Sequence, residues 1–384
     1  MKRKLYQKIL DRIESAEAIV VTGMRRVGKT VLLRQLYDAV PSQNKIFLDL
    51  ENPVNQKYFE EKNYESIRYE FEVLGINSTK RAYIFLDEIQ FVRNVPSVVK
   101  YLMDHYPYKF FLTGSASFYL KNLFSESLAG RKILYELFPL DFEEFLQLKG
   151  QAFVIPRGKT NESLYRTFIP FYREYLEYGG FPGVVGKPTA AEKKEALEEI
   201  FTSYFNKEVL GIGEFRNNAV VRDLILLLAA RVGSKIDVQK LAAELGTTRI
   251  TIGEYLSFLE GTYFLTLLAP HSTNRDTEIR GAKKVYLCDT GLANILGKRE
   301  FGAVFENMVF HQLRPRGEAK YYQRKSMVEV DFVVNGTEAW EVKTKAGRQD
   351  VVRIKRLGKE LGLKKNHVVS LEWTDVPVLY GFQL

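Results

Sequence analysis

The sequence predicts an α/β fold, with a parallel, doubly wound sheet over residues 15–150. The first observation is the stretch 18–33 (AIVVTGMRRVGKTVLL), which runs from an apolar strand through a glycine-bounded loop into an apolar helix. The second is that helical stretches separate further short apolar runs, at 45–50, 81–87, 109–115 and 132–138. Buried strands that alternate with helices are typical of a parallel sheet covered on both faces.

The loop in the first stretch matches a phosphate-binding pattern. Residues 23–30 (GMRRVGKT) fit G-x-x-x-x-G-K-[ST] in full. The two glycines let the backbone turn so that its amides point inward and hold phosphate oxygens at a helix N-terminus. Lys29 is expected to reach the β and γ phosphates, and the hydroxyl of Thr30 to ligate Mg²⁺. The sequence therefore predicts ATP and Mg²⁺ as ligands. The residues expected around the nucleotide are Gly23, Met24, Arg25, Arg26, Val27, Gly28, Lys29, Thr30 and Val31.

Composition limits the classes of protein to which the chain can belong. Its 384 residues, 46% of them hydrophobic, suffice for two or three domains. A net charge of +9 is compatible with a nucleic-acid partner without requiring one. Cys288 is the single cysteine beside four histidines, which excludes an intramolecular disulfide and a structural zinc site. No stretch resembles a transmembrane helix or a signal-peptide core, so we expect a cytoplasmic protein without membrane contact.

Two carboxylates follow directly after the apolar run that ends at residue 86. Open α/β sheets place their chemistry at the carboxyl ends of the strands. Asp87 is therefore expected to hold Mg²⁺ opposite Thr30, directly or through water. Glu88 is expected to orient or deprotonate the attacking water. The alternative, a surface acidic pair at a strand end, is weakened by the phosphate-binding loop that precedes it.

The next apolar run ends in hydroxyl groups. Thr113, Ser115 and Ser117 are placed where they would sense a γ-phosphate or a polarised water. The alternative is that these residues cap the helix expected over 117–127. The residues alone favour neither interpretation.

A polar stretch at 150–162 predicts a linker, and the helical periodicity that follows predicts a lid over the nucleotide. This periodicity is interrupted at 179–183 (GGFPG), where the glycines permit a tight turn. Residues 235–270 then read as a short helix, a turn with Gly246, and a second helix. Two strand-like segments follow, at 263–269 and 284–287.

This helix, turn, helix and strand pattern predicts a winged helix. The side chains expected to face a DNA groove are Thr247, Thr248, Arg249 and Thr251. The alternative is a winged helix that serves only for packing or protein contacts.

The last part of the chain carries a second type of chemistry. A strand-like segment at 327–334 contains Asp331, and the next contains Glu341 and Lys343, which share one face because they lie two residues apart. Two carboxylates beside a lysine can bind Mg²⁺ and activate water for phosphodiester cleavage. Residues 313–365 contain fourteen Lys and Arg against seven Asp and Glu, which favours a phosphate-rich partner.

Four segments together resemble a known family. GMRRVGKT, IFLDEIQ, FLTGSAS and SLAGRKILYELFPLDFEEF look like the archaeal and bacterial AAA+-type P-loop ATPases that carry a C-terminal domain of long-unknown function. The resemblance implies that Arg131 contacts phosphate, within the subunit or from a neighbour, and that Arg25 and Arg26 add charge near the phosphates. It also implies a homo-oligomer. The alternative for Arg131 is a surface ion pair.

The C-terminal pattern D-x₉-E-V-K, with Glu306 on a preceding helix, is similar to the PD-(D/E)XK nuclease superfamily. That resemblance implies a catalytic site formed by Glu306, Asp331, Glu341 and Lys343, in which Asp331 and Glu341 hold the metal. One departure is that no proline precedes Asp331. The alternative is a nuclease-like domain that no longer cuts.

Together these patterns predict an ATPase core (1–150), a helical lid (151–232), a winged helix (233–290) and a restriction-endonuclease-like α/β domain (291–384). The expected function is Mg²⁺-dependent ATP hydrolysis coupled to winged-helix movement on duplex or branched DNA, and nuclease activity stays open. The alternative is an ATP-dependent regulatory switch that controls assembly or partner binding, with a degenerate nuclease-like domain.

Overall fold

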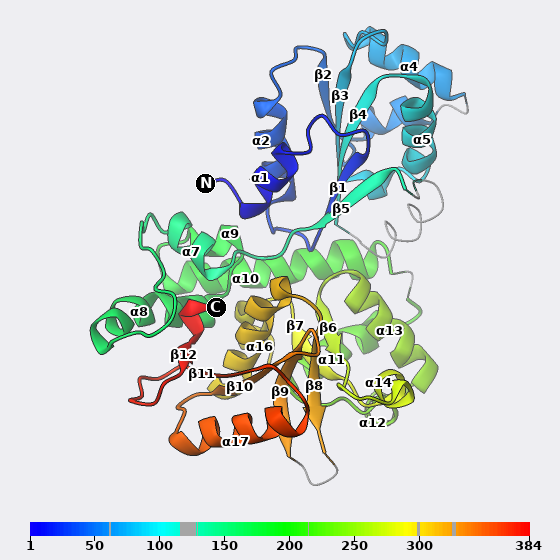
Figure 1. The fold of residues 1–384 in the computed structure, drawn as a ribbon. Coiled ribbons are helices and arrows are strands. Elements are labelled where there is room, and N and C mark those ends of the chain that lie inside the picture. The colour runs from blue at the N-terminus through cyan, green and yellow to red at the C-terminus, as the bar shows by residue number, and fades with distance from the viewer. Residues whose placement is uncertain (61–62, 116–127, 129, 214, 298–299, 325–327) are drawn as a thin grey trace. The chain divides into compact units, whose positions relative to one another are not determined.

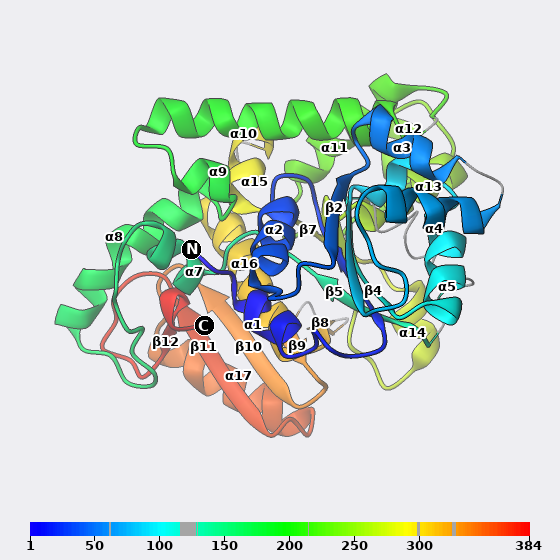
Figure 2. The same cartoon turned by 90° about the horizontal axis from the view of Figure 1, so that it is seen from above.

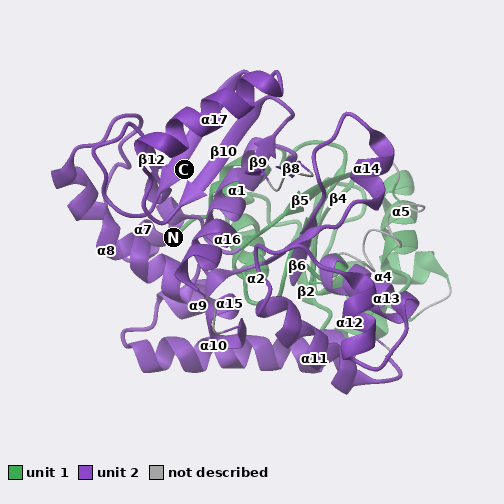
Figure 3. Cartoon of the chain, turned by 90° about the horizontal axis from the view of Figure 1, so that it is seen from below, with its two compact units in different colours: residues 1–138, 261–263 green, residues 139–260, 264–384 purple. Residues whose placement is uncertain are grey.

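The computed structural model describes residues 1–60, 63–115, 128, 130–213, 215–297, 300–324 and 328–384. The chain divides into two compact units, which Figure 3 distinguishes by colour: residues 1–138 with 261–263, and residues 139–260 with 264–384. Residues 139–150, which we expected in the ATPase core, belong to unit 2. The segments expected as lid, winged helix and nuclease-like domain also lie in unit 2, apart from 261–263.

Unit 1 contains a five-stranded sheet in which every pairing is parallel, as the sequence predicts (Figure 1). Its strands are β1 (Ala18–Thr22), β2 (Lys45–Asp49), β3 (Ala82–Asp87), β4 (Tyr108–Gly114) and β5 (Lys132–Glu136). The strand order is β2-β3-β4-β1-β5, so β4 separates the strand before the phosphate-binding loop from the strand that carries the acidic pair. Every residue of β1, β3 and β4 is buried, which explains their nearly continuous apolar runs.

Helices cover both faces of this sheet, as Figures 1 and 2 show. They are α1 (Lys4–Leu10), α2 (Lys29–Ala39), α3 (Pro53–Gln56), α4 (Tyr64–Val73) and α5 (Val95–His105). On the face of α4 and α5, Phe71 and Leu102 share a core with Ile84 and Phe110 of the central strands. α4 begins after Asn63, whose side chain caps the helix by accepting a hydrogen bond from the Glu65 amide. The helix expected over 117–127 lies outside the described residues.

Unit 2 begins with helices. They are α7 (Phe142–Leu148), α8 (Glu162–Tyr178), α9 (Pro182–Val185), α10 (Ala190–Tyr204), the π-helix Phe205–Leu210, α11 (Asn218–Ala229), α12 (Val238–Glu244) and α13 (Arg249–Gly261). A capping box starts α7: the Glu144 amide donates to the Asp141 carboxylate (2.9 Å), and the Asp141 amide donates to the Glu144 carboxylate (3.2 Å). None of the helices in the described ranges is both long and apolar enough to cross a bilayer.

Two sheets follow in unit 2. β6 (Leu265–Leu268) and β7 (Lys284–Leu287) form an antiparallel pair, connected through α14 (Arg275–Arg280). After α15 (Thr290–Gly297) and α16 (Phe301–Leu313) comes a mixed sheet of order β12-β11-β10-β9-β8. Its strands are β8 (Ala319–Gln323), β9 (Glu329–Val334), β10 (Glu338–Lys343), β11 (Lys365–Ser370) and β12 (Leu379–Tyr380), with α17 (Arg348–Glu360) between β10 and β11.

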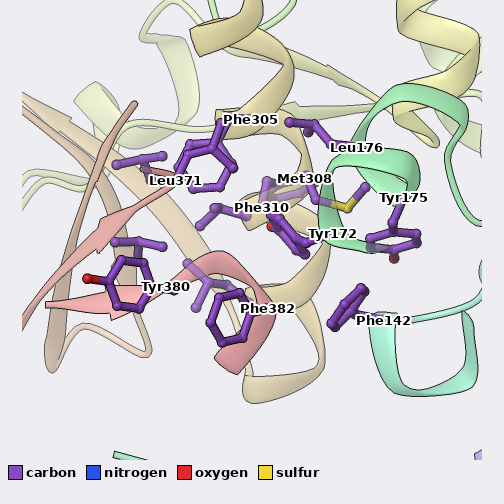
Figure 4. Packing of buried hydrophobic residues seen from close by; sticks show 14 of the residues in the cluster. Phe142, Tyr172, Tyr175, Leu176, Phe305, Met308, Phe310, Leu371, Tyr380 and Phe382 are labelled. Carbon is purple, nitrogen blue, oxygen red and sulfur yellow. The ribbon is translucent and has the colours of Figure 1, made fainter. Parts of the chain in front are cut away.

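One hydrophobic core joins the beginning of unit 2 to its end (Figure 4). Phe142 and Tyr172, from α7 and α8, pack in the same cluster as Phe305 of α16 and as Tyr380 and Phe382 near the C-terminus. A second cluster lies under α17. Because the expected lid helices and the C-terminal sheet share the first core, they form one compact unit.

The GGFP turn owes its two glycines to the close approach of other groups. A Cβ on Gly179 (φ 75°) would lie 2.0 Å from a carboxylate oxygen of Asp289, and a Cβ on Gly180 would lie 2.4 Å from the carbonyl oxygen of Leu140. The sequence predicts a structural role for this turn, and the structure shows what the turn accommodates.

Candidate active site

The phosphate-binding loop connects β1 to the first turn of α2. Gly23 and Gly28 have φ angles of 153° and 97°, which only glycine adopts readily, and Arg26 between them is also left-handed, at φ 67°. A Cβ on Gly23 would lie 2.1 Å from the carbonyl oxygen of Leu137. The first glycine of the pattern is therefore required by backbone angle and by space.

The Lys29 side chain closes this loop from within. Lys29 is buried, and its ammonium donates to the carbonyl oxygens of Gly23 (2.9 Å) and Met24 (3.0 Å). The cation is thus held against the loop whose amides are expected to face phosphate oxygens. Exchanging carbonyl acceptors for phosphate oxygens needs only local motion of a flexible side chain.

Asp87 lies at the carboxyl end of β3 and is buried. The hydroxyl of Thr113, on neighbouring β4, donates to its carboxylate. Burial raises the pKa of Asp87, while hydrogen bonds from Thr113 and Thr30 oppose that rise. Thr30 and Asp87, the two predicted magnesium ligands, are therefore in direct contact. Their hydroxyl and carboxylate oxygens are hard donors of the kind that Mg²⁺ prefers, so these residues fit the ion.

Glu88 follows Asp87 in a left-handed conformation, at φ 53°. Its amide donates to the Thr113 hydroxyl (3.2 Å), so Thr113 contacts both members of the acidic pair. The side-chain amide of Gln90 donates to the Glu88 carboxylate and to the Ser115 hydroxyl (2.9 Å), and the Ser115 amide donates back to Gln90 (3.3 Å). Thr113 thus contacts the acidic pair directly, whereas Ser115 is linked to it through Gln90. Gln90 was missed by sequence reasoning because an amide two residues after Glu88 matches no catalytic pattern.

Replacing Gln90 by alanine is expected to lower kcat for ATP about tenfold with a smaller change in KM, since a general base contributes about 10²–10⁴-fold when it is held in place. Steady-state ATP hydrolysis measures both constants. Gln7→Ala is the matched control, because Gln7 also donates to a carboxylate (Asp11, 2.8 Å) but lies on α1. Equal kcat values for the two variants would remove Gln90 from the site.

Arg131 lies away from the loop. Its carbonyl oxygen accepts from Ala18 at the start of β1, whereas the loop follows the end of that strand, about 16 Å further on. Its guanidinium forms an ion pair with Asp104 (2.7 Å), the alternative considered for it. A phosphate contact within the subunit is therefore not supported, and a contact to a neighbour's nucleotide stays a prediction. Arg25 is buried, Arg26 and Val31 are exposed, and Ser117 lies outside the described residues.

The C-terminal candidates lie on two inner strands of the mixed sheet, β9 and β10, and on α16. Asp331 on β9 accepts a hydrogen bond from the Val342 amide of neighbouring β10 (2.7 Å). Glu341 on β10 is buried, and its Oε1 contacts Lys343 Nζ (2.6 Å) and the guanidinium of Arg353 from α17. Its other oxygen, Oε2, accepts no hydrogen bond from any residue that the structure describes.

Glu306 on α16 is partnered by two side chains of β7. Lys284 Nζ lies 3.1 Å and the Tyr286 hydroxyl 2.7 Å from Glu306 Oε1. Lys284 also pairs with Glu329 of β9. Burial, together with the nearby Asp331 charge, raises the pKa of Glu306 to about 7 against the opposing effect of Lys284. Sequence reasoning missed Lys284, because it appeared only as part of a short wing strand.

This C-terminal cluster does not fit the metal site of a nuclease. Two cations outside the motif, Lys284 and Arg353, already pair with Glu306 and Glu341, on which that site would depend. Across the described ranges, no three His, Cys, Asp or Glu side chains converge as a group that could hold a metal ion. The cluster as arranged therefore does not support metal-dependent cleavage of a phosphodiester.

The segment expected to face DNA has the predicted helices and strand pair. Thr248 precedes α13, and its Oγ1 accepts from the Thr251 amide (3.1 Å) and lies 2.9 Å from the Thr251 hydroxyl. The Thr248 hydroxyl thus caps the start of the helix. Contact with DNA and the alternative, packing or protein contacts, both stay predictions. Arg249 is exposed, as is Ile250, whose exposed fraction is 75%.

Comparison with known proteins identifies the first part of the chain. Residues 15–146 match the family model of the AAA domain, and residues 169–301 match a domain of unknown function, DUF8612. An uncharacterized protein of Haemophilus influenzae is 25% identical over 402 residues, covering 99% of this chain and 97% of that protein. The uncharacterized protein MJ1544 of Methanocaldococcus jannaschii is 30% identical over 328 residues, covering 83% of this chain and 72% of that protein.

A solved structure of the Aeropyrum pernix ORC1 protein in complex with DNA aligns over 80% of this chain and 93% of its own. The sequence identity is 12% and the TM-score 0.33, a likeness too slight to carry an argument.

The parallel sheet, the loop and the AAA match together define a P-loop nucleotide-binding protein with the fold of an AAA-type ATPase, which confirms the prediction for unit 1. Within that class, the chain belongs to the family that includes MJ1544 of M. jannaschii. The winged-helix and nuclease resemblances stay predictions.

Proposed function

We propose that the chain hydrolyses ATP at the carboxyl edge of the unit 1 sheet and acts on DNA. The observation that carries hydrolysis is the convergence of Lys29, Thr30 and Asp87 at the loop and at this edge. Lys29 transfers its hydrogen bonds from loop carbonyls to the β and γ phosphates. Mg²⁺ held by Thr30 and Asp87 would neutralise charge on the phosphate oxygens.

Glu88 acts on the attacking water. Its carboxylate accepts a proton from, or orients, the water that attacks the γ-phosphate. Gln90 holds that carboxylate and links it to Ser115, so the two form a fixed unit with the end of β4. All these contacts therefore occur at the carboxyl ends of the strands, beside the phosphate-binding loop.

DNA as the partner is supported by a line of cations on α17. Arg348, Lys355 and Lys359 are exposed and form no ion pair with any described residue. With Val352, which is 67% exposed, they follow the spacing of one helix face over about 16 Å. We call Arg348, Lys355 and Lys359 the α17 basic surface.

Nothing on the helix offsets this charge. The Asp350 carboxylate accepts a hydrogen bond from the Gly347 amide at the helix start, and Glu360 forms an ion pair with Arg324 (2.6 Å). Lys355 and Lys359, one turn apart, repel each other at a cost of about 0.2–0.5 kcal/mol. A nucleic-acid backbone, with about one negative charge per 1.7 Å of duplex axis, supplies the missing counter-charge.

The test is a charge reversal of the α17 basic surface, R348E/K355E/K359E. Duplex affinity is expected to fall at least about tenfold, and the slope of log K against log salt to decrease by about 2–3, because each lost phosphate contact removes about 0.9. The control R166E/K187E/K194E changes net charge equally on exposed residues of the same unit. Equal loss in both variants would show that only net charge matters and would refute the surface.

The regulatory switch remains the second candidate, and the charge-compensated C-terminal cluster favours it. If the C-terminal domain does not cleave DNA, ATP hydrolysis would instead control assembly or partner binding. ATP turnover measured with duplex, branched and single-stranded DNA separates the candidates. Stimulation by DNA supports the first; no stimulation, with a particle size that follows the bound nucleotide, supports the second.

A further inference from the structure

The cluster on β7, α16, β9 and β10 contains a buried ammonium that neither the ATPase site nor the α17 basic surface uses. Lys284 is 4% exposed and lies among the carboxylates of Glu306 (3.1 Å), Glu329 and, a little further, Asp331. Tyr286, two residues on, donates to the same oxygen of Glu306. Alternate residues of one short strand thus both point at one carboxylate.

Lys284 stays charged in this place. Burial alone would lower the pKa of Lys284, but the carboxylates of Glu306, Asp331 and Glu329 outweigh burial and raise its pKa above the ordinary value. A buried ammonium is stabilised by carboxylates that surround it closely, and the same holds for a metal ion. The ammonium therefore has the electrostatic role that a cation would have among these carboxylates.

The rest of the cluster agrees with this role. Lys343 and Arg353 neutralise Glu341, so three basic side chains stand among the four carboxylates of Glu306, Glu329, Asp331 and Glu341. The set therefore has one net negative charge, and a divalent ion added beside the three basic side chains would leave it with one net positive charge. Glu341 Oε2 is buried and accepts no hydrogen bond from the described residues.

We propose that Lys284 is the resident cation of this cluster and excludes divalent metal from it. The carboxylates around it, those of Glu306, Glu329 and Asp331, then become available to a divalent ion only when the Lys284 ammonium is removed. This inference goes beyond the proposed ATPase and DNA-binding activities and does not depend on either.

Calorimetric titration of the nucleotide-free protein with Mn²⁺ at pH 7 tests the proposal. Lys284→Met, which keeps the length of the side chain without its charge, is expected to bind Mn²⁺ at least tenfold more tightly than the parent. The added Asp331→Asn substitution should abolish that gain. Mn²⁺ should also raise the unfolding midpoint of Lys284→Met more than that of the parent, since a ligand stabilises the folded state that binds it.

Two further variants keep the result interpretable. Lys284→Met/Glu306→Gln removes one charge of each sign, and it replaces Lys284→Met in the titration if that variant does not fold. The double variant should also bind Mn²⁺ more tightly than the parent. Lys320→Met is the matched control, because Lys320, on β8, pairs with Glu278 of α14 and should gain nothing. The proposal would be overturned if the parent bound Mn²⁺ as tightly as the Lys284 variants and if Asp331→Asn in the parent abolished that binding. A folded double variant with no gain would do the same.

Discussion

Lys29→Ala is expected to lower the rate of ATP turnover by at least about 100-fold, because the loss of one positioned charge-stabilising donor typically costs about 10²–10³ in kcat. Lys29 is the one cation whose buried ammonium rests on the carbonyls of Gly23 and Met24 inside the described loop. No neighbouring side chain on α2 can replace it, since Thr30 carries no charge and Val31 is exposed. The fold should persist, because the loop geometry depends on the glycines.

The control for this prediction is Lys45→Ala. Lys45 also donates to two backbone carbonyls, those of Tyr37 (2.8 Å) and Val40 (2.7 Å), but it lies at the start of β2, at the other edge of the sheet. The Lys45→Ala variant should lose some stability and keep the parent rate of ATP turnover. Circular dichroism checks the fold of both variants. If Lys29→Ala hydrolyses ATP at the parent rate, the assignment of the loop as the catalytic site is wrong.

The unit 1 site was predictable because its chemistry depends on local patterns. A loop bounded by Gly23 and Gly28, and an acidic pair after a buried strand, are short sequence signals whose geometry is fixed by the parallel sheet. Gln90 was not predictable, because its role comes from a contact with Ser115 on another strand. Arg131, named through resemblance, lies beside the start of β1 and pairs with Asp104, so its contact to a neighbour's nucleotide stays a prediction.

The C-terminal cluster was harder to predict for the same reason. The sequence placed Asp331 and Glu341 on neighbouring strands, and the structure has them there. It gave no sign that Lys284 and Arg353 would reach the same carboxylates, since Lys284 lies 47 positions before Asp331 and approaches through a different sheet. Spacing within a motif predicts neighbours on one sheet, but it does not reveal which cations arrive from elsewhere in the chain.

The second large effect is expected at Asp289, which precedes α15. Its carboxylate accepts from the amides of Gly180 (2.7 Å), Gly291 (2.8 Å) and Leu292 (3.3 Å). Asp289→Ala leaves these buried donors without a partner and should lower the free energy of unfolding by about 3 kcal/mol or more, at about 1–3 kcal/mol for each. Urea unfolding measures the loss. Asp237→Ala, an exposed cap of α12 with similar amide contacts, should lose only about 1 kcal/mol.

The same carboxylate gives the stability of the protein a pH dependence of known sign. Burial raises the pKa of Asp289 to about 6, although the three amides oppose that rise. The folded state therefore binds an extra proton between about pH 4 and 6, so the contribution of Asp289 to stability is full below pH 4 and is lost as the pH rises through 6. Two pKa units correspond to about 3 kcal/mol. Asp289→Asn should flatten this part of the profile; an unchanged slope in urea unfolding between pH 4 and 7 would show that Asp289 does not titrate there.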